Sequence, residues 1–245
     1  MFYDLENPIK FAKDICEILD KNGIWILEQS YLPMMLETVS YDTVCHEHIE
    51  FYALKQIDYI ARESGLRIID VETNNINGGS FQIVVAKKDS EFSINDSVNQ
   101  MLESEEIEGY NDIDVYLEFK ERIEKNKKLV EDFFKKVKEE NKLVIGYGAS
   151  TKGNVMLQYC NLTGDDLVAI ADVNPDKYGH VTPGSRIPII SEEEARSLKP
   201  DYFFVLPWHF RDFILSKEKQ YIYDSDCKFC FAFPDFEIVG KDNIE

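Results

Sequence analysis

The sequence predicts an α/β protein in which a charged helical segment joins two units. Apolar runs of strand length alternate with amphipathic helical segments in residues 1–90. Residues 91–141 are highly charged, with apolar side chains at helical spacing, and we expect this helical connector to pack on the unit that follows. Residues 142–245 start with a strand that runs into a glycine-rich turn and a helix.

The first ninety residues are predicted to form helix, strand, long loop, helix, strand and strand. Asn7 and Pro8 mark a helix start, because asparagine caps helices and proline is favoured at the first helical position. The continuous apolar run Ile24–Leu27 predicts a strand covered on both faces. The first helix has no preceding strand to pack on, and a parallel sheet needs more strands than this segment offers. We therefore expect part of this domain to be missing upstream.

In residues 142–245, the runs Leu143–Ile145, Leu167–Ala171 and Tyr202–Leu206 are predicted to be buried strands. The formal charge of −19 argues against binding to nucleic acid or to an anionic membrane, although it leaves room for a small phosphorylated ligand. The chain has no apolar run of about 18 residues, so we predict no membrane span. The polar amino terminus and the five scattered cysteines predict a cytoplasmic protein with reduced thiols.

His46, Glu47 and His48 lie in the long loop and include half of the four histidines. An imidazole beside an orienting carboxylate is a natural general base near neutral pH, and a loop of this length is often functional. The alternatives are a pair of structural histidines and a metal site that includes Cys45. On these residues alone, structure ranks first, catalysis second and metal third.

The turn after the first strand of residues 142–245 contains Gly146, Gly148 and Gly153, and Asp172 ends the next strand. This pattern places amides at a helix start and a carboxylate near a ribose hydroxyl, although the third glycine comes two positions late for a dinucleotide fingerprint. It is not a P-loop, since Gly153 follows Lys152. A tight turn that only starts a helix is the alternative, and we rank binding above it.

Two further patterns are open to a structural reading. His209 follows the strand Tyr202–Leu206 at its carboxyl end, the usual edge for ligands in open α/β sheets, and a helix cap is the alternative. Cys227 and Cys230 form a lone pair without a second pair, which favours buried strand residues over a redox or zinc site.

Taken together, these segments resemble the S-adenosylmethionine-dependent C-methyltransferases that act on nucleotide-linked deoxysugars. The likeness covers nearly the whole chain, and several motifs in the same order are more specific than any one of them. It rests on Glu28–Tyr31, Tyr41–His48, Asn77–Ser80, Gly146–Asn154 and Pro207–Phe210.

The resemblance implies a three-part protein with a zinc module, a donor-binding domain and a carboxy-terminal Rossmann-like domain that helps to hold the sugar nucleotide. It implies methyl transfer to C3 of a 4-keto-hexose, in which a base removes the C3 proton and the enolate attacks the donor methyl group. His48 matches the base, with Glu47 beside it, and Tyr41 and Asn77 would line the same cleft. The residues that would face the nucleotide-linked sugar are Gly146, Tyr147, Gly148, Ser150, Lys152, Asn154, Asp172 and His209.

The chain also departs from the family pattern. The zinc cysteines and the glycine-rich loop for the methyl donor are absent, so residues 1–90 correspond to the second half of a class I methyltransferase domain, and we predict no metal site. A position of Met1 inside a longer reading frame would explain the missing part, as would a truncated chain or one half of a split enzyme. We expect this chain alone neither to bind S-adenosylmethionine well nor to turn over. The protein partners that we consider are an upstream fragment and a second copy of the chain in a homo-oligomer.

Two alternatives remain at this point. One is a non-catalytic module that binds a nucleotide or sugar nucleotide through the glycine turn. The other is an NAD-dependent oxidoreductase, suggested by the glycine turn and Asp172. We rank the oxidoreductase last, because it explains nothing about His46, Glu47 and His48.

Overall fold

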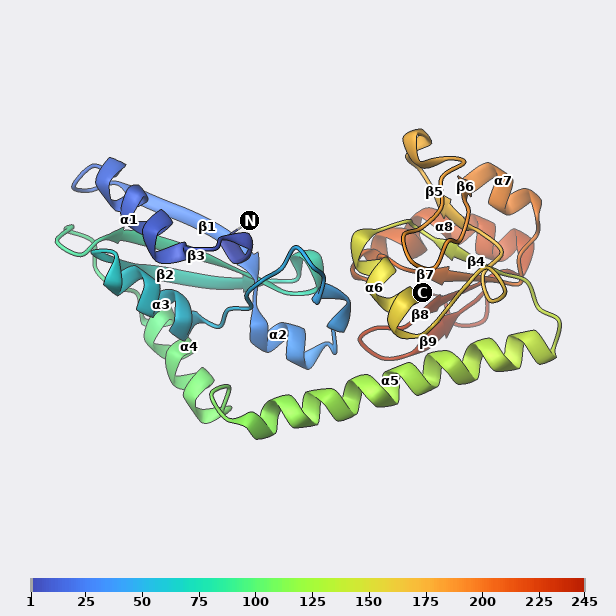
Figure 1. Ribbon diagram of the computed structural model, residues 1–245, viewed down its shortest axis with the longest axis horizontal. Coiled ribbons are helices and arrows are strands. Elements are labelled where there is room, and N and C mark those ends of the chain that lie inside the picture. The colour runs from blue at the N-terminus through green and yellow to red at the C-terminus, as the bar shows by residue number, and fades with distance from the viewer. Residues whose placement is uncertain (1, 245) are drawn as a thin grey trace. The chain divides into compact units, whose positions relative to one another are not determined.

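A computed structural model describes residues 2–244, which divide into two compact units (Figure 1). Unit 1 contains the residues up to Glu37 together with His46–Phe119, and unit 2 contains Thr38–Cys45 and the residues from Lys120 onward. None of the helices in the described part of the chain combines the length and apolar character needed to cross a lipid bilayer.

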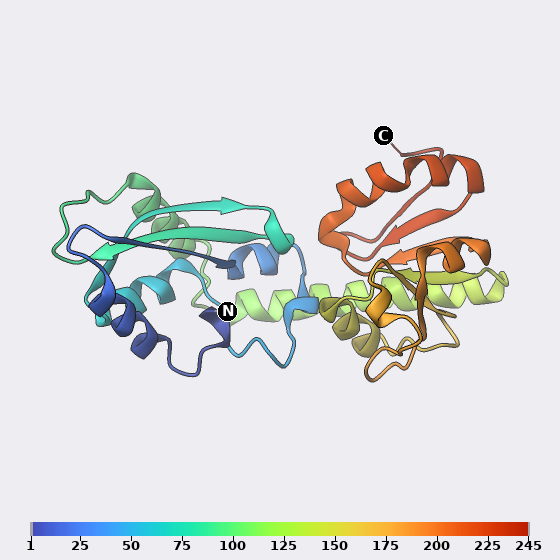
Figure 2. The same ribbon diagram turned by 90° about the horizontal axis from the view of Figure 1, so that it is seen from above.

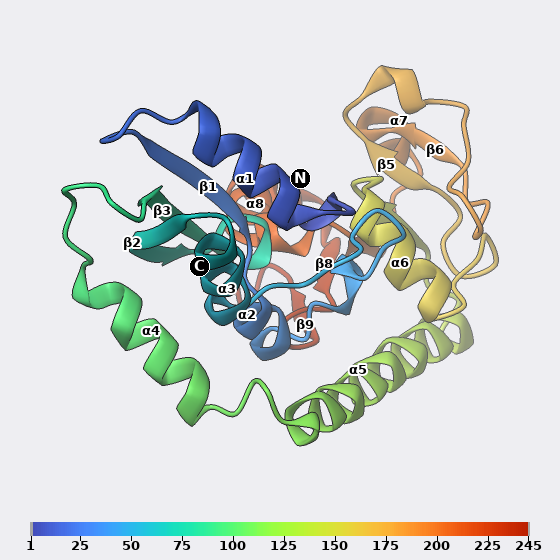
Figure 3. The ribbon, with the colours of Figure 1, turned by 60° about the vertical axis from the view of Figure 1, so that its left-hand side comes forward.

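Unit 1 is built on a three-stranded antiparallel sheet in the order β1-β3-β2, with helices α1 and α3 packed side by side (Figure 3). The predicted helix start is confirmed, because α1 begins at Pro8 and the Asn7 side chain accepts a hydrogen bond from the Lys10 amide at 2.9 Å. The elements are η1 (Phe2–Asp4), α1 (Pro8–Ile18), β1 (Ile24–Ser30), α2 (Leu32–Glu37), α3 (Leu54–Glu63), β2 (Leu66–Asn74), η3 (Ile76–Gly78), β3 (Ser80–Lys87) and α4 (Asp96–Ile107).

Strand β1 differs from its prediction. It lies at the edge of the sheet and pairs antiparallel with β3 alone, and the side chains of Ile24 and Ile26 are 45% and 54% exposed. Leu27 faces the covered side and is buried. The predicted strand covered on both faces is therefore wrong for these residues, because a continuous apolar run does not by itself tell which faces are covered.

Unit 2 contains a mixed six-stranded sheet in the order β6-β5-β4-β7-β8-β9, in which only the β8–β9 pair is antiparallel. Figure 2 shows α8 (Arg211–Ser225) on one face of this sheet and α5 (Ile113–Glu139) and α6 (Thr151–Tyr159) on the other. This confirms the predicted α/β Rossmann-like arrangement, and the direction of strand progression reverses at β4. The elements are η2 (Tyr41–Thr43), β4 (Val144–Tyr147), α6 (Thr151–Tyr159), β5 (Ile170–Asp172), η4 (Pro175–Lys177), β6 (Ile189–Ser191), α7 (Glu192–Ser197), β7 (Tyr202–Val205), η5 (Trp208–Phe210), α8 (Arg211–Ser225), β8 (Lys228–Phe231) and β9 (Glu237–Val239).

The connector predicted over residues 91–141 contains α4 and the 27-residue helix α5 (Ile113–Glu139). The division between the units falls inside α5, after Phe119. Farther along α5, the rings of Phe133 and Phe134 lie 6.3 and 5.0 Å from the ring of Phe204 in β7. The prediction that this helix packs on the following domain is confirmed.

Candidate functional site

His48 lies in unit 1, in the irregular segment that leads to α3. Its imidazole packs edge-on against the ring of Tyr3, with 4.5 Å between centroids, and lies 6.4 Å from the ring of Phe51. The carbonyl of Tyr3 accepts hydrogen bonds from the amides of Ile49 and Glu50, each at 3.2 Å. The backbone after His48 is therefore fixed to Tyr3, which gives the imidazole a defined position.

A small cavity adjoins His48, and its wall includes Ser30 and Tyr31 at the end of β1. Its volume of about 10 Å³ is close to the space that one water molecule needs. The Tyr31 amide donates to the carbonyl of Gly79 at 3.2 Å. The motifs around Tyr31, His48 and Gly79, far apart in the sequence, therefore meet in one unit.

The Asn77–Ser80 loop has a backbone that requires glycine. Gly79 has a φ of 127°, and a Cβ atom there would lie 2.5 Å from Cβ of Met34. Asn77 has a φ of 56° and an exposed side chain at the loop. Asparagine tolerates this left-handed conformation, which gives Asn77 a structural reason to be there, and its contact with substrate stays a prediction.

Tyr31 is held by a buried carboxylate that the sequence analysis missed. Glu105 is 2% exposed and accepts hydrogen bonds from the Tyr31 hydroxyl at 2.8 Å and from the amides of Leu54 and Lys55 at 2.6 and 3.0 Å. Burial and the nearby carboxylate raise the pKa of Tyr31, so the hydroxyl stays a donor. No sequence signal distinguishes Glu105 from its acidic neighbours.

His46 and Glu47 are exposed, and the Nε2 atom of His46 lies 3.9 Å from Oε1 of Glu47. The contact of the Glu47 carboxylate is thus with His46, whereas the resemblance placed Glu47 beside the base His48. Within residues 2–244, no three His, Cys, Asp or Glu side chains are grouped so that they could hold a metal ion. The structure gives the metal alternative no support.

Tyr41 belongs to unit 2, whereas His48 belongs to unit 1. Its ring lies in the core of unit 2, 5.1 Å from Tyr159 and 5.0 Å from Phe233. Its hydroxyl donates a long hydrogen bond of 3.4 Å to Oδ1 of Asn126, and burial raises the pKa of Tyr41. These contacts are those of a core residue and do not support the predicted catalytic role.

The glycine turn of unit 2 follows β4 and starts α6. Gly148 has a φ of 81°, and a Cβ atom there would lie 2.7 Å from the ring of Pro207. The Ser150 hydroxyl caps α6 by accepting from the Gly153 amide at 3.0 Å. Gly146 lies inside β4, where a Cβ atom would come 2.7 Å from Ile170. Close strand packing, and not contact with a ligand, thus explains Gly146.

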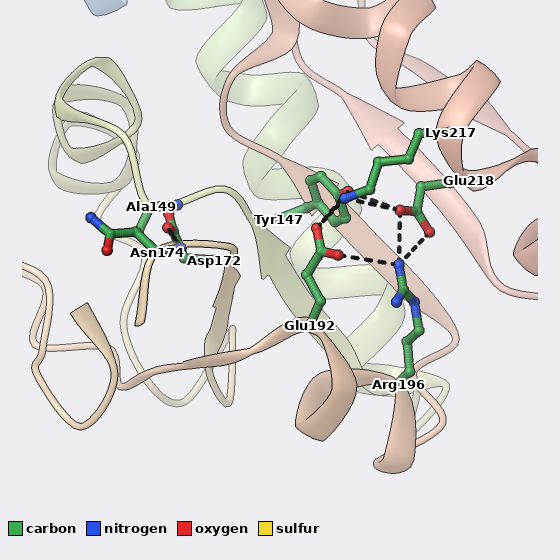
Figure 4. Close-up of polar contacts among 8 residues, drawn as sticks. All are labelled: Tyr147, Ala149, Asp172, Asn174, Glu192, Arg196, Lys217 and Glu218. Carbon is green, nitrogen blue, oxygen red and sulfur yellow. Dashed lines mark hydrogen bonds and ion pairs between the residues drawn. The ribbon is translucent and has the colours of Figure 1, made fainter. Parts of the chain in front are cut away.

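Asp172 ends β5, and its carboxylate is already engaged within the protein (Figure 4). Its Oδ2 atom accepts from the Ala149 amide at 2.8 Å and from Nζ of Lys177 at 3.1 Å. Its Oδ1 atom accepts from the Asn174 amide at 2.8 Å. The carboxylate that would hold a ribose in a dinucleotide fold instead ties the glycine turn to the loop after β5. This removes the main support for the oxidoreductase alternative.

A cavity of about 620 Å³ opens at the carboxyl edge of β4, β5 and β7, where ligands bind in open α/β sheets. Of the residues predicted to face the nucleotide sugar, Tyr147, Gly148, Ser150 and Asp172 line it. Gly146, Lys152, Asn154 and His209 do not. The remaining lining residues are Ala149, Ala171, Val173, Asn174, Lys177, Glu192, Pro207, Phe210, Phe213, Ile214 and Lys217.

Tyr147, which lines this cavity, anchors a polar network (Figure 4). Its hydroxyl lies 2.9 Å from Oε1 of Glu192 and 3.0 Å from Oε1 of Glu218. Lys217 contacts the Tyr147 hydroxyl at 3.0 Å and Glu192 at 2.6 Å, and Arg196 reaches both oxygens of Glu218 at 2.8 Å. Burial and the two carboxylates raise the pKa of Tyr147. Two carboxylates and two cations balance each other in this network.

A second group of ionisable side chains surrounds the start of α6. Asp42 is buried, and its Oδ2 atom accepts from Nε1 of Trp208 at 2.8 Å, whereas Oδ1 has no hydrogen-bond partner. Burial raises the pKa of Asp42 and lowers the pKa of Lys152, and the attraction between the two opposes both shifts. Asn154 is half-buried on the same helix. Sequence reasoning missed Asp42, which lies only six positions from His48.

His209 is held neutral beside this group. Burial and the nearby charge of Lys152 lower the pKa of His209 to about 4, and its Nδ1 atom is buried without a partner. Because the pKa in the folded protein lies below the ordinary value of 6.5, the neutral imidazole contributes stability above about pH 6.5. That stability is lost as the pH falls from about 6.5 toward 4.

We therefore expect the free energy of unfolding of the His209→Gln variant to increase relative to that of the wild type as the pH falls. The difference in unfolding free energy should move by about 1–2 kcal/mol between pH 7 and about pH 4.5, after allowance for partial solvent screening. Urea unfolding at both pH values measures it. The control is His180→Gln at an exposed histidine. An equal pH response of the two variants would contradict a depressed pKa at His209.

The C-methyltransferase C-terminal domain family matches residues 75–234 of this chain. C-methyltransferase NovU of Streptomyces niveus is 30% identical to the chain over 229 residues. This stretch is 94% of the chain and 54% of NovU, so the chain spans about half the length of this relative. The family match includes the whole cavity of unit 2 and starts after His48.

Proposed function

Because this chain belongs to the C-methyltransferase family, we propose that it is the acceptor-side, base-bearing part of an enzyme that methylates C3 of a nucleotide-linked 4-keto-deoxyhexose. The main support is the position of His48, which Tyr3 and Phe51 hold beside a small cavity that Tyr31 also lines. The cavity of unit 2 is proposed to bind a nucleotide-linked sugar.

In this proposal His48 is the general base. The ketone at C4 acidifies the proton on C3, because the electron pair left on C3 is delocalised onto the ketone oxygen as an enolate. A neutral imidazole can accept that proton near pH 7. The edge contact with Tyr3 would orient the ring, and the fixed backbone at Ile49 and Glu50 would keep it from turning away. Glu47 stays a proposed helper whose present contact is with His46.

The family implies S-adenosylmethionine as the methyl donor, and the described residues do not fit it. In residues 2–244, the glycine-rich turn between a parallel strand and a helix is found in unit 2, and there Asp172 is occupied by two amides and a lysine. The sheet of unit 1 is antiparallel and contributes no such turn among its described residues. We propose that donor binding depends on residues beyond this chain, supplied by an upstream fragment.

Proton exchange at C3 tests the base without a methyl donor. The chain is incubated with a thymidine-diphosphate 4-keto-6-deoxyhexose in D₂O, and loss of the C3 proton signal is followed by NMR. We expect the chain to accelerate exchange and His48→Ala to slow it about 100-fold or more, the usual contribution of a general base. The control is His180→Ala, at an exposed histidine of unit 2. Equal exchange with both variants would refute His48 as the base.

A non-catalytic sugar-nucleotide module is the second candidate function. The cavity of unit 2 favours it, because its lining is complete within that unit. A module of this kind would bind the sugar nucleotide without accelerating exchange at C3, so the same NMR experiment separates the two.

A further inference from the structure

Tyr52 carries a buried hydroxyl whose hydrogen-bonding capacity is unused within the described chain. The residue is 5% exposed, and its hydroxyl oxygen forms no hydrogen bond with the described residues. The ring has a fixed position, because it packs 5.7 Å from the ring of Phe2 and the Tyr52 carbonyl accepts from the Leu32 amide at 2.9 Å. A buried hydroxyl costs stability unless it finds a partner, and an ordered water molecule commonly provides one. The Tyr52 hydroxyl therefore indicates a water site.

The small cavity beside His48 has the size and the lining for one water molecule. Tyr52 and His48 both line it, and its volume of about 10 Å³ is close to the space that one water needs. Ser30 lines it as well and adds a second hydroxyl, whereas the hydroxyl of Tyr31 is engaged with Glu105. Internal waters form about three hydrogen bonds, so two hydroxyls and one imidazole are enough.

A water at this place would matter for a base of the imidazole type. A neutral imidazole has one N–H donor and one acceptor nitrogen, and the partner of the N–H decides which tautomer forms. A water that accepts from one ring nitrogen leaves the other nitrogen free to take up a proton. The tautomer of His48 therefore depends on what fills the cavity beside it.

We propose that the small cavity binds one water molecule, and that Tyr52 is a positioning residue that fixes the tautomer of His48 through this water. The water accepts from the His48 N–H and from the Tyr52 hydroxyl, and it donates to the Ser30 hydroxyl. The N–H stays directed at the water before and after the second ring nitrogen takes up the C3 proton. This inference rests on the proposed function for the role of His48 and deepens it, whereas the water site depends on residues of unit 1 alone.

The ¹⁵N spectrum of the histidine side chains tests the water-mediated contact without any substrate. The purified chain is labelled with ¹⁵N-histidine, and the signals that are missing from His48→Ala identify His48. At about pH 8, where an imidazole is ordinarily neutral, we expect two widely separated ring nitrogen signals, as for a single tautomer. In Tyr52→Phe the two signals should move toward each other, because the tautomers mix.

The substitution Tyr52→Phe removes one oxygen atom and keeps the ring, so the packing against Phe2 is retained. The matched control is Tyr59→Phe, at an exposed tyrosine of α3 that does not line the small cavity. This control should leave the signals of His48 where they are in the wild type. Signals of His48 that are the same in Tyr52→Phe and in the wild type would overturn the proposal.

Proton exchange at C3 separates this inference from the proposed function. At saturating sugar nucleotide we expect Tyr52→Phe to slow the exchange about three- to tenfold, the change that one hydrogen bond of ordinary strength corresponds to. KM should stay unchanged, because Tyr52 does not contact the substrate in this proposal. Altered His48 signals in Tyr52→Phe, in a chain that does not exchange the C3 proton, would refute the proposed function alone. Exchange that Tyr52→Phe does not slow would refute only the positioning role.

Discussion

Replacement of Glu105 by alanine is expected to destabilise unit 1 by about 3 kcal/mol, because it leaves several buried donors without an acceptor. The carboxylate accepts from the Tyr31 hydroxyl and from the Leu54 and Lys55 amides. Both amides belong to the first turn of α3, whose N-terminal dipole also favours a negative charge. One side chain therefore caps a helix and fixes a tyrosine at the end of a strand.

Each unit contains one tryptophan, Trp25 in unit 1 and Trp208 in unit 2. Labelling with 5-fluorotryptophan gives one ¹⁹F resonance for each unit, so urea unfolding of unit 1 can be followed separately. The control Glu106→Ala removes an exposed neighbour whose pair with Lys55 should contribute about 1 kcal/mol or less. A loss in Glu105→Ala no larger than in this control would contradict the role of the buried carboxylate.

Glu105 also matters for the proposed base. Tyr31 and His48 line the same small cavity, and Tyr31 is the residue that Glu105 holds. The Tyr31→Phe variant should lose only about 1 kcal/mol, because the two helix amides keep their acceptor. Glu105 thus supports the wall of this cavity through Tyr31, although it lies 74 positions after Tyr31 in the sequence. In the proposal Glu105 contacts no substrate.

The sequence predicted the features that depend on local chemistry. The Asn7 cap, the strand-to-helix turn at Gly148 and the amphipathic face of α5 follow from the conformational limits of single residues or from helical spacing. The edge position of β1 was not predictable in this way. Ile24 and Ile26 are as apolar as their neighbours, and their exposure depends on which face of the sheet the rest of the fold covers.

The engagement of Asp172 within the protein was not predicted, for a related reason. Asp172 stands where a ribose ligand is expected, and Ala149 and Lys177, which occupy it, are placed by the fold of two loops. Phe213 and Lys217 have helical spacing, but the same spacing describes any solvated helix face. Only the folded structure shows that both side chains line the cavity at the edge of the sheet.

The Arg196→Met variant should destabilise unit 2 by about 3–5 kcal/mol, since it leaves Glu218 as a buried carboxylate without its main partner. Glu218 is 1% exposed, and Arg196 contacts both of its oxygens at 2.8 Å. Lys217 lies farther away, at 3.5 Å, and its closest contact is with Glu192. Among the described residues, Arg196 and Lys217 are the cations that form ion pairs with Glu218, so the charge would remain poorly compensated without Arg196.

The ¹⁹F resonance of Trp208 follows this unfolding, and the double variant Arg196→Met, Glu218→Leu provides the decisive comparison. Removal of both charges should restore much of the stability, because an apolar pair carries no desolvation penalty. The surface control Lys120→Met, which removes an exposed partner of Glu124, should cost about 1 kcal/mol or less. If the double variant is as unstable as Arg196→Met, then the geometry of the network, and not the uncompensated charge of Glu218, holds this wall of the cavity.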